Sequence, residues 1–224
     1  MNKQHPEKDI APLLWGQMIN EYALNQVQVA QLERYLDLLI EWNQKFNLTA
    51  ITDPSLIVQH HFQDSLALSH FIDFSKIRTV ADIGTGAGFP GLPLKILFPH
   101  LVMILIEVNS KKRSFLEHVV NVLRLTNVII YPYDWRTFLR MTDYKIDYFF
   151  ARASLQPEEL IRIFKPASPY RDAIMIYWAS QQWVPQKNET SFIEKKESYS
   201  IGSVPRKYIF FRQGSIDKSM KTIR

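Results

Sequence analysis

A glycine-rich segment is the clearest chemical feature of the 224-residue sequence, because four of its seven glycines fall between Gly84 and Gly91. The segment follows a short β-rich run at residues 80–83 and precedes a helical pattern. Glycine is needed where the backbone turns with a positive φ, or where a ligand approaches too closely for a Cβ atom. This position predicts a ligand-binding loop between a strand and a helix. A tight turn without a ligand is the alternative.

The spacing of the glycines does not by itself choose the ligand. Gly86, Gly88 and Gly91 satisfy the G-x-G-x-x-G pattern of dinucleotide-binding loops. Two other features favour S-adenosylmethionine. Asp82 stands just before the loop, where its carboxylate could engage the ammonium group of that cofactor directly or through water. Two prolines, at positions 90 and 93, remove amide donors that a pyrophosphate would use at a helix start.

Three further strand ends carry candidate ligand contacts. Glu107 closes the second β-rich run, where a carboxylate can accept hydrogen bonds from both ribose hydroxyls of either cofactor class. A solvated carboxylate is the alternative. Trp135, followed by Arg136, comes after the third run and could stack on an adenine, or could be a core residue of the next helix. Arg152 ends the fourth run at the expected topological switch point, where ligands bind; a structural ion pair is its alternative.

The elements that position these residues alternate in type from residue 78 onward. The expected strands are residues 79–83, 102–107, 128–131, 146–151 and 173–178. The expected helices between them are residues 92–98, 110–125, 134–141 and 157–164. Such alternation with short links predicts βαβ units and a parallel sheet. An antiparallel hairpin of residues 192–201 and 207–212 is expected to close the sheet edge.

The first seventy residues are predicted to be helical. One apolar stripe recurs at three- and four-residue spacing and consists of Leu32, Tyr35, Leu36, Leu39, Trp42 and Phe46. Asn25 and Gln28 are spaced as its capping box. A second helix is expected to begin at Asp53, with Pro54 as its first residue, and to run to about residue 71. A polar loop at residues 47–52 joins the two.

The composition excludes several function classes. The chain has no cysteine, which excludes disulfides, Cys-ligated metal sites and a thiolate nucleophile. Residues 1–77 carry five basic and nine acidic side chains, whereas residues 78–224 carry twenty-two and thirteen. A basic body is typical of a nucleic-acid binder, and an unevenly charged surface is the alternative. The candidate phosphate-binding residues are Lys111, Lys112, Arg113, Arg136, Arg140 and Arg171.

No targeting or membrane segment is expected. No apolar run reaches the ~18 residues of a membrane span. The charged residues 1–9 do not resemble a secretory signal. The expectation is a cytoplasmic protein that does not contact a membrane.

With these residues placed, the sequence resembles the RsmG family, also called GidB, whose members are small-subunit rRNA guanine-N7 methyltransferases. The resemblance covers about residues 36–152. It consists of the segments Trp42-Asn43, Asn47-Leu48-Thr49-Ala50-Ile51, His61 with Asp64-Ser65-Leu66, Asp82-Ile83-Gly84-Thr85-Gly86-Ala87-Gly88-Phe89-Pro90-Gly91, Lys111-Lys112, Phe115-Leu116 and Ala151-Arg152-Ala153. The first two segments and the F-P-G extension of the loop are the more specific parts.

The resemblance implies a Rossmann-like, seven-stranded class I methyltransferase sheet with an N-terminal helical extension. It implies a helical cap at residues 1–77, a catalytic domain at 78–212 and a flexible basic tail at 213–224. The implied cofactor is S-adenosylmethionine, without a metal, and the implied target is a guanine in the 530 loop of 16S rRNA, free or in an assembling 30S subunit. A monomer is expected. The residues carried over as cofactor contacts are Gly84, Phe89, Trp135, Arg136 and Arg152.

The sequence also departs from the family pattern at four positions. His60 stands where a basic residue usually precedes the histidine. Ala151 replaces the serine of S-R-A, and Ser154 replaces the aromatic residue that follows it. Ala179 lies in Trp178-Ala179-Ser180, where the family has a Lys-Gly pair. The glycine loop is intact, and the departures are expected on the substrate side.

The implied reaction needs no catalytic base, because guanine N7 already carries a lone pair. Alignment and electrostatics should therefore supply the catalysis. Besides Arg152, the candidate substrate-side residues are His61, Asp64, Asn47 and Thr49. His61 and Asp64 shape the cleft or serve the structure alone, and Asn47 and Thr49 either read the guanine edge or cap a helix.

Three alternatives remain open from the sequence. A methyltransferase acting on a small molecule predicts modification without RNA. A dinucleotide-dependent dehydrogenase predicts nicotinamide binding, although residues 155–224 are short for a catalytic half. A non-catalytic RNA-binding relative would keep the glycine loop as a relic.

Overall fold

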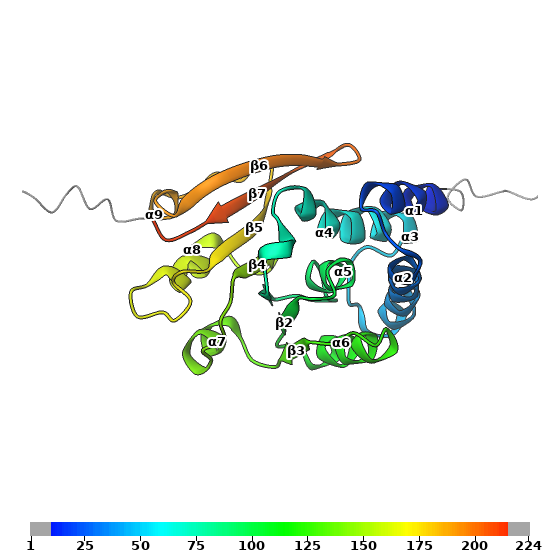
Figure 1. Ribbon diagram of the computed structural model, residues 1–224, viewed down its shortest axis with the longest axis horizontal. Helices are drawn as coiled ribbons and strands as arrows, with labels where there is room; N and C mark the ends of the chain where they lie inside the picture. Colours follow the sequence, from blue (N-terminus) through cyan, green and yellow to red (C-terminus); the bar gives the residue numbers. More distant parts are fainter. Residues whose placement is uncertain (1–9, 215–224) are drawn as a thin grey trace, which may run out of the picture.

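The computed structural model describes residues 10–214, and within this range one mixed sheet of seven strands forms the centre of the molecule (Figure 1). The strand order is β3-β2-β1-β4-β5-β7-β6. The predictions for residues 1–9 lie outside the described residues, as does nearly all of the predicted basic tail.

Five strands are parallel, and the last two form the antiparallel edge. The parallel strands are β1 (Thr79–Ile83), β2 (Val102–Ile106), β3 (Val128–Tyr131), β4 (Tyr148–Arg152) and β5 (Ile174–Ser180). The hairpin of β6 (Ile193–Ile201) and β7 (Val204–Phe211) joins the sheet through antiparallel pairing of β7 with β5. The predicted parallel sheet with a closing hairpin is therefore confirmed.

Strand β4 begins two residues later than predicted, at Tyr148. The preceding Asp147 uses its carboxylate to accept the backbone N–H groups of Arg78 and Thr79, at 2.8 and 3.0 Å. This residue anchors the start of β1. A propensity pattern cannot reveal that use of the side chain.

Helices cover both faces of the sheet, because successive side chains of a strand point to opposite sides. One face packs against α5 (Gly91–Leu97) and α6 (Ser110–Val122), and the other against α7 (Trp135–Met141) and α8 (Pro157–Leu160). The predicted helix at 110–125 ends earlier because Arg124 has a φ of +52°, in the left-handed region. The predicted helix at 157–164 ends as a 3₁₀ turn, η5 (Ile161–Phe164). A short helix, α9 (Lys187–Thr190), precedes the hairpin.

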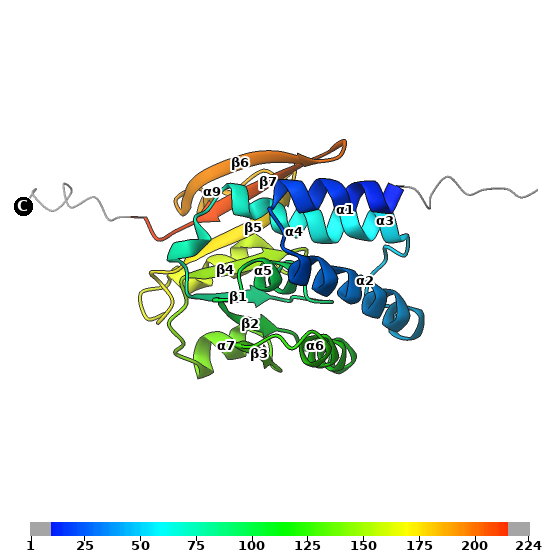
Figure 2. The ribbon, with the colours of Figure 1, turned by 45° about the vertical axis from the view of Figure 1, so that its right-hand side comes forward.

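The N-terminal helices extend the α5/α6 layer (Figure 2). They are α1 (Ile10–Glu21) and α2 (Gln26–Phe46). The predicted capping box is present, since Asn25 and Gln28 exchange backbone-to-side-chain bonds of 3.0 Å. Residues of both helices share one buried cluster with residues of the sheet. The division between cap and catalytic domain at residue 77 stays a prediction.

The second predicted helix is continuous from Pro54 to His70 but changes type along its length. It begins as α3 (Pro54–Ile57) and passes through a π-helical turn, η2 (Val58–Gln63). It then continues as α4 (Asp64–Leu66) and ends in 3₁₀ turns, η3 (Ala67–His70) and, after a break, η4 (Phe74–Lys76). The Asp53 cap and the Pro54 start are as predicted. The π turn, a feature frequent at functional sites, was not foreseen. In the described range, no helix combines the length and apolarity that spanning a bilayer requires.

Candidate active site

The glycine-rich loop joins β1 to α5 at the carboxyl edge of the sheet. Gly84, Gly86 and Gly88 have φ values of +62°, +64° and +98°, which only glycine adopts readily. A Cβ on Gly84 would lie 2.6 Å from the Cβ of Ser154, so the loop also needs glycine for close packing against the end of β4.

The Asp82 side chain of β1 fixes the conformation of the loop through hydrogen bonds. Its Oδ2 accepts hydrogen bonds from the Thr85 hydroxyl (2.6 Å) and the Gly91 amide (2.9 Å). Burial raises the pKa of its carboxyl to about 6, against the lowering effect of these hydrogen bonds. The side chain is fully buried and lines neither of the two cavities beside the loop. This carboxylate therefore fixes the loop through Oδ2, while its Oδ1 is buried without a partner among the described residues. The predicted contact with a cofactor ammonium stays a prediction.

An aromatic stack supports the loop from the helical layer. The Tyr35 hydroxyl of α2 donates to the carbonyl of Ala87, and its ring stacks on Phe89 with centroids 5.2 Å apart. The His61 ring also stacks on Phe89, with centroids 4.8 Å apart, and Phe62 packs edge-on against Phe89 with centroids 5.2 Å apart. The sequence predicted Tyr35 only as part of an apolar stripe.

Two cavities flank the loop and meet at Gly84, Lys112 and Ala153. We call them the arginine cavity, about 630 Å³, and the glutamate cavity, about 510 Å³. They lie at the carboxyl ends of β1 and β4, between which the strand order reverses. This switch point is where doubly wound sheets bind their ligands.

The glutamate cavity is lined by Glu107, Asp134, Trp135, Arg136 and Ser154, among others. The two carboxylate oxygens of Glu107 accept the amides of Gly86 (3.0 Å) and Asn109 (2.8 Å). Each oxygen keeps a second lone pair for a ligand hydroxyl.

Trp135 and Arg136 both contact the Glu159 segment at this cavity. Trp135 packs in the core beside Phe138 and Phe149, and its Nε1 donates to the carbonyl of Glu159 at 3.3 Å. The core alternative therefore describes its ring, although the residue still forms part of the cavity wall. The Arg136 guanidinium forms a two-point ion pair with the Glu159 carboxylate.

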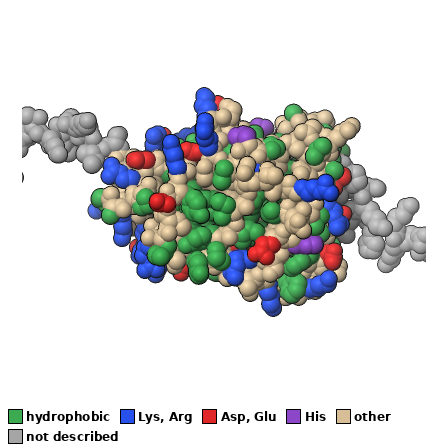
Figure 3. All heavy atoms as spheres, turned by 60° about the horizontal axis from the view of Figure 1, so that its bottom comes forward, with side chains coloured by type: hydrophobic (Ala, Val, Ile, Leu, Met, Phe, Trp, Pro, Cys, Tyr) green, Lys and Arg blue, Asp and Glu red, His purple; other side chains and the backbone are tan. Residues whose placement is uncertain are grey.

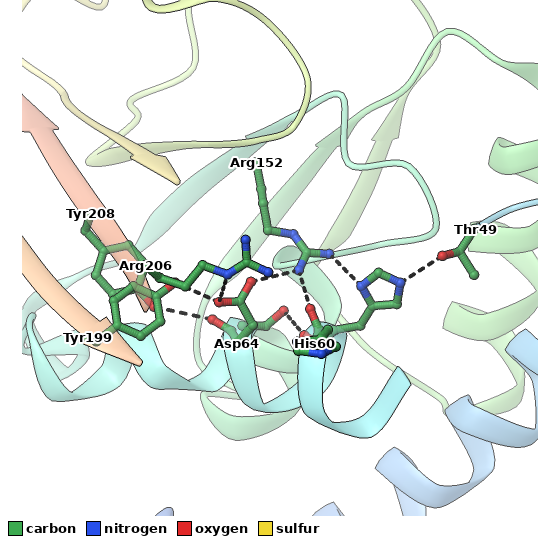
Figure 4. Close-up of polar contacts among 9 residues, drawn as sticks. Thr49, His60, Asp64, Arg152, Tyr199, Arg206 and Tyr208 are labelled. Carbon is green, nitrogen blue, oxygen red and sulfur yellow. Dashed lines mark hydrogen bonds and ion pairs between the residues drawn. The ribbon is translucent and has the colours of Figure 1, made fainter. Parts of the chain in front are cut away.

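Arg152 organises the arginine cavity (Figure 4). Its Nη1 donates to the His60 carbonyl (3.0 Å) and to Asp64 Oδ2 (3.1 Å), while its Nη2 contacts His61 Nδ1 (3.2 Å). Its side chain is only 15% exposed, and its guanidinium lies 5.5 Å from the centre of the Phe89 ring. The structure therefore brings together three predicted residues, Arg152, His61 and Asp64.

Asp64 receives further partners from the C-terminal hairpin, which the sequence did not reveal. The Tyr199 hydroxyl donates to Oδ1 at 2.7 Å, and Arg206 Nε lies 4.0 Å from the same oxygen. The Tyr208 hydroxyl donates to the Asp64 backbone carbonyl at 3.3 Å. The carboxylate side chain is 3% exposed. Tyr199 is 135 residues away in the sequence, so no local pattern indicates this contact.

Burial, reinforced by the charge of Arg152, lowers the pKa of His61 to about 3. The imidazole is therefore neutral near pH 7, and its Nε2 lies 2.8 Å from the Thr49 hydroxyl. Thr49 also lines the arginine cavity, and its role toward a substrate stays a prediction.

Asn47 lies elsewhere. It is the exposed C-cap of α2, with a φ of +49°, and lines neither cavity. The capping alternative describes this residue, and the prediction that it reads a base edge is not supported by its position.

The four departures from the family pattern do not share one location. His60 and Ala179 line the arginine cavity, whereas Ser154 lines the glutamate cavity. Ala151 is buried within β4. The four positions therefore do not line one cavity, and their placement on the substrate side stays a prediction.

The predicted phosphate-binding residues are also dispersed. The Arg113 guanidinium donates to backbone carbonyls that include Glu107, and Arg136 is engaged by Glu159. Arg171 lies in the segment before β5, at the opposite edge of the sheet from the glycine loop. On the face shown in Figure 3, hydrophobic side chains gather at the centre and Lys and Arg side chains stand around them. Of the six residues, Lys112 alone lines both cavities.

No group of three or more His, Asp or Glu side chains between residues 10 and 214 is arranged to hold a metal ion.

Comparison with known proteins identifies close sequence relatives. A family model described as rRNA small subunit methyltransferase G (GidB) matches residues 28–209. The ribosomal RNA small subunit methyltransferase G of Listeria monocytogenes is 34% identical over 189 residues, which are 84% of this chain and 78% of that protein. The protein of the same name from Halalkalibacterium halodurans is 42% identical over 127 residues, 57% of this chain and 53% of that protein. In such higher-identity matches the chain spans about half the length of the curated relatives.

A solved structure supports the fold assignment. The crystal structure of a SAM dependent methyltransferase from Aquifex aeolicus has a TM-score of 0.52 and 19% sequence identity, covering 74% of this chain and 97% of that one. At this identity the likeness concerns the fold alone. The sheet is the seven-stranded class I methyltransferase sheet, preceded by an N-terminal helical extension, as predicted.

Proposed function

Because the chain belongs to the GidB family, rRNA small subunit methyltransferase G, we propose that it transfers a methyl group from S-adenosylmethionine to N7 of a guanine in the 530 loop of 16S rRNA. The observation that carries this proposal is the meeting of the two cavities at Gly84 and Ala153. A donor bound in one cavity and an acceptor bound in the other would face each other across the glycine loop.

The glutamate cavity fits the cofactor. Glu107 has free lone pairs for the ribose hydroxyls, and the buried Ser154 hydroxyl that lines the cavity has no partner among the described residues. When bound, S-adenosylmethionine supplies a methyl group activated by its sulfonium. Contacts to Asp134, Trp135 and Arg136 would come from the wall beside Glu107.

The start of α5 argues against a dinucleotide in the same site. Pro90 and Pro93 have no N–H, the Gly91 amide donates to Asp82, and the Leu92 amide donates to the Gly88 carbonyl at 2.7 Å. A pyrophosphate needs free amides at a helix N-terminus, and this first turn offers it none.

The arginine cavity suits an acceptor that reacts through its own lone pair. His61 contacts Arg152 with one ring nitrogen and Thr49 with the other, and its pKa lies far below neutrality. It is therefore not placed to remove a proton, and guanine N7 requires no such step. The contribution of these residues is to hold the base in line with the methyl group.

The proposal extends to the organisation of the molecule. Residues 1–77 act as a cap, because Thr49, His61 and Asp64 of the arginine cavity come from that segment, and residues 78–212 carry the cofactor. We expect the protein to act as a monomer. The partner is small-subunit rRNA, free or in an assembling 30S subunit, which places the protein in the cytoplasm.

Labelled S-adenosylmethionine and small subunits that lack the modification provide the test. We expect 7-methylguanosine at one position of the 530 loop, mapped by mass spectrometry of nuclease fragments. Label on another nucleotide, or on small molecules without RNA, would overturn the rRNA assignment. Cofactor binding in calorimetry without any methyl transfer would instead favour a non-catalytic RNA-binding protein.

A further inference from the structure

The Thr49 hydroxyl occupies an unusual position in the arginine cavity. It comes from the loop between α2 and α3, far from the glycine loop in sequence, yet lines the same cavity as Arg152 and Phe89. Its oxygen contacts two groups, the His61 imidazole at 2.8 Å and the Ile51 backbone amide at 3.2 Å.

The direction of these hydrogen bonds is fixed by Arg152. A guanidinium can only donate, so His61 Nδ1, 3.2 Å from Arg152 Nη2, must accept. The neutral ring then carries its single hydrogen on Nε2 and donates it to Thr49 Oγ1. The low pKa of His61 agrees with this single-proton state.

The Thr49 oxygen is left with no free lone pair. A hydroxyl has two lone pairs and one hydrogen. The Ile51 amide takes one lone pair and His61 Nε2 takes the other. The hydroxyl hydrogen has no acceptor among residues 10–214, so it remains available to a ligand in the arginine cavity. The hydrogen bonds from Arg152 to His61 and from His61 to Thr49 therefore leave the Thr49 hydroxyl able to donate but not to accept.

We propose that Thr49 is a specificity-determining residue whose hydroxyl donates a hydrogen bond to O6 of the target guanine. This inference rests on the proposed function. On a purine, position 6 lies beside N7: guanine presents an oxygen acceptor there and adenine presents an amino donor. A hydroxyl that can only donate forms a hydrogen bond with the guanine oxygen and forms none with the adenine amino group. It therefore selects guanine on the same edge that receives the methyl group.

A carboxylate oxygen of the cofactor would offer the same acceptor chemistry. The two sources differ in what removal of the hydroxyl changes. An O6 contact affects transfer to guanine and leaves cofactor affinity unchanged, whereas a carboxylate contact weakens cofactor binding.

The test combines protein variants with acceptor analogues. Small subunits are reconstituted with ligated 16S rRNA that carries guanosine, inosine or 2-aminopurine riboside at the target position. Inosine keeps O6 and loses the 2-amino group, and 2-aminopurine loses O6 while keeping N7. Wild type, Thr49→Val and Thr49→Ser are compared by kcat/KM for methyl transfer, together with Asn47→Ala as a matched control in the same loop region but outside the cavities.

The expected result is a coupling between Thr49 and O6. For guanosine, Thr49→Val should lower kcat/KM about 10- to 100-fold, and Thr49→Ser and Asn47→Ala should stay within about 3-fold of wild type. Relative to guanosine, 2-aminopurine should cost wild type about 10- to 100-fold more than it costs Thr49→Val. Any intrinsic difference in N7 reactivity cancels in this comparison. The ratio of kcat/KM for inosine to that for guanosine should be the same in wild type and Thr49→Val, because both bases keep O6.

The outcomes separate this inference from the function on which it rests. If wild type methylates guanosine and the losses from Thr49→Val and 2-aminopurine simply multiply, Thr49 is structural and the inference is wrong. If Thr49→Val instead weakens cofactor binding in calorimetry, the acceptor is the cofactor carboxylate and the base contact is refuted. If wild type methylates no guanine while binding the cofactor, the proposed function fails and this inference with it.

Discussion

Burial shifts the pKa values of His61 and Asp82 in opposite directions, so the two residues change the stability of the folded state in opposite ways as the pH falls. The shift of His61 is the larger. Its folded-state pKa of about 3 lies below the ordinary value of 6.5. The unfolded chain therefore binds a proton more readily below pH 6.5, and the stability of the folded state falls as the pH falls. From pH 7.5 to pH 5, this residue should remove about 2 kcal/mol from the free energy of unfolding.

Urea unfolding of wild type and His61→Gln at these two pH values measures that contribution. Wild type should lose about 2 kcal/mol more than the variant on acidification. Asp82 acts in the opposite sense, because its carboxyl pKa of about 6 stabilises the folded state as the pH falls below 6. This residue is present in both proteins, so its effect cancels in the difference. Equal losses in the two proteins would contradict the buried, neutral state of His61.

A second residue-level prediction concerns Gly88. Its φ is +98°, and a Cβ there would meet the Tyr35 hydroxyl and lie 2.6 Å from Leu92 Cδ1. We expect Gly88→Ala to lower the free energy of unfolding by about 2 kcal/mol or more and to abolish cofactor binding, measured by urea unfolding and calorimetry.

Gly16 provides the matched control for this substitution. It lies within helix α1, where a Cβ would meet nothing within 4 Å. Gly16→Ala should therefore raise stability by about 0.5–1 kcal/mol and leave cofactor binding unchanged. An equal effect of the two substitutions would show that the loop tolerates a side chain at Gly88.

At the scale of elements, the C-terminal hairpin completes the arginine cavity. Tyr199 of β6 donates to the buried Asp64 carboxylate of α4, whose other oxygen accepts from Arg152 of β4. Removing that hydroxyl leaves the carboxylate with fewer donors. Tyr199→Phe should lower the free energy of unfolding by about 1.5–3 kcal/mol and slow methyl transfer, as measured by urea unfolding and the subunit assay.

Tyr133→Phe is the control, because its side chain is 59% exposed and lines neither cavity. It should change stability by less than about 0.5 kcal/mol. If Tyr199→Phe behaves like this control, the hairpin only closes the sheet and does not support the cavity.

Sequence patterns predicted most elements because their signals are local. The period of the apolar stripe, the Asn25 and Asp53 caps and the strand–helix alternation all depend on neighbours within a few residues. The π turn at Val58–Gln63 was missed because its apolar pattern is that of an ordinary helix. The Asp64–Tyr199 contact joins residues 135 positions apart, and only the folded sheet brings them together.

The same limit applies to the candidate site. The glycine loop was predicted correctly as a strand-to-helix turn, since its conformation requires glycine locally. The placement of Asp82 beneath the loop, and of Asn47 outside both cavities, depends on which side of the backbone each side chain occupies. No spacing rule in a single sequence fixes that orientation.

At the scale of the whole molecule, the helical cap and the sheet form one packed unit with the site at their junction. Trp15 and Leu32 from the cap belong to the same buried cluster as Leu92 and Phe210 from the sheet domain. The arginine cavity takes lining residues from both parts. Because the N-terminal helices share the core with the sheet, the two parts are packed together, and under the proposed function RNA would reach the cavities beside Lys112, which lines both.

Because Lys112 lines both cavities, we expect its ammonium group to contact an RNA phosphate beside the site. Binding of single-stranded RNA releases counterions, and log K falls with log[salt] by about 0.7 for each phosphate contact. We expect affinity for a 530-loop RNA to fall steeply with salt and Lys112→Gln to reduce the slope by about 0.7, measured by fluorescence anisotropy across a salt series. Lys76→Gln is the matched control, because Lys76 is an exposed lysine at the opposite edge of the sheet, before β1. An unchanged slope for Lys112→Gln, or an equal change for Lys76→Gln, would place the RNA path elsewhere on the surface.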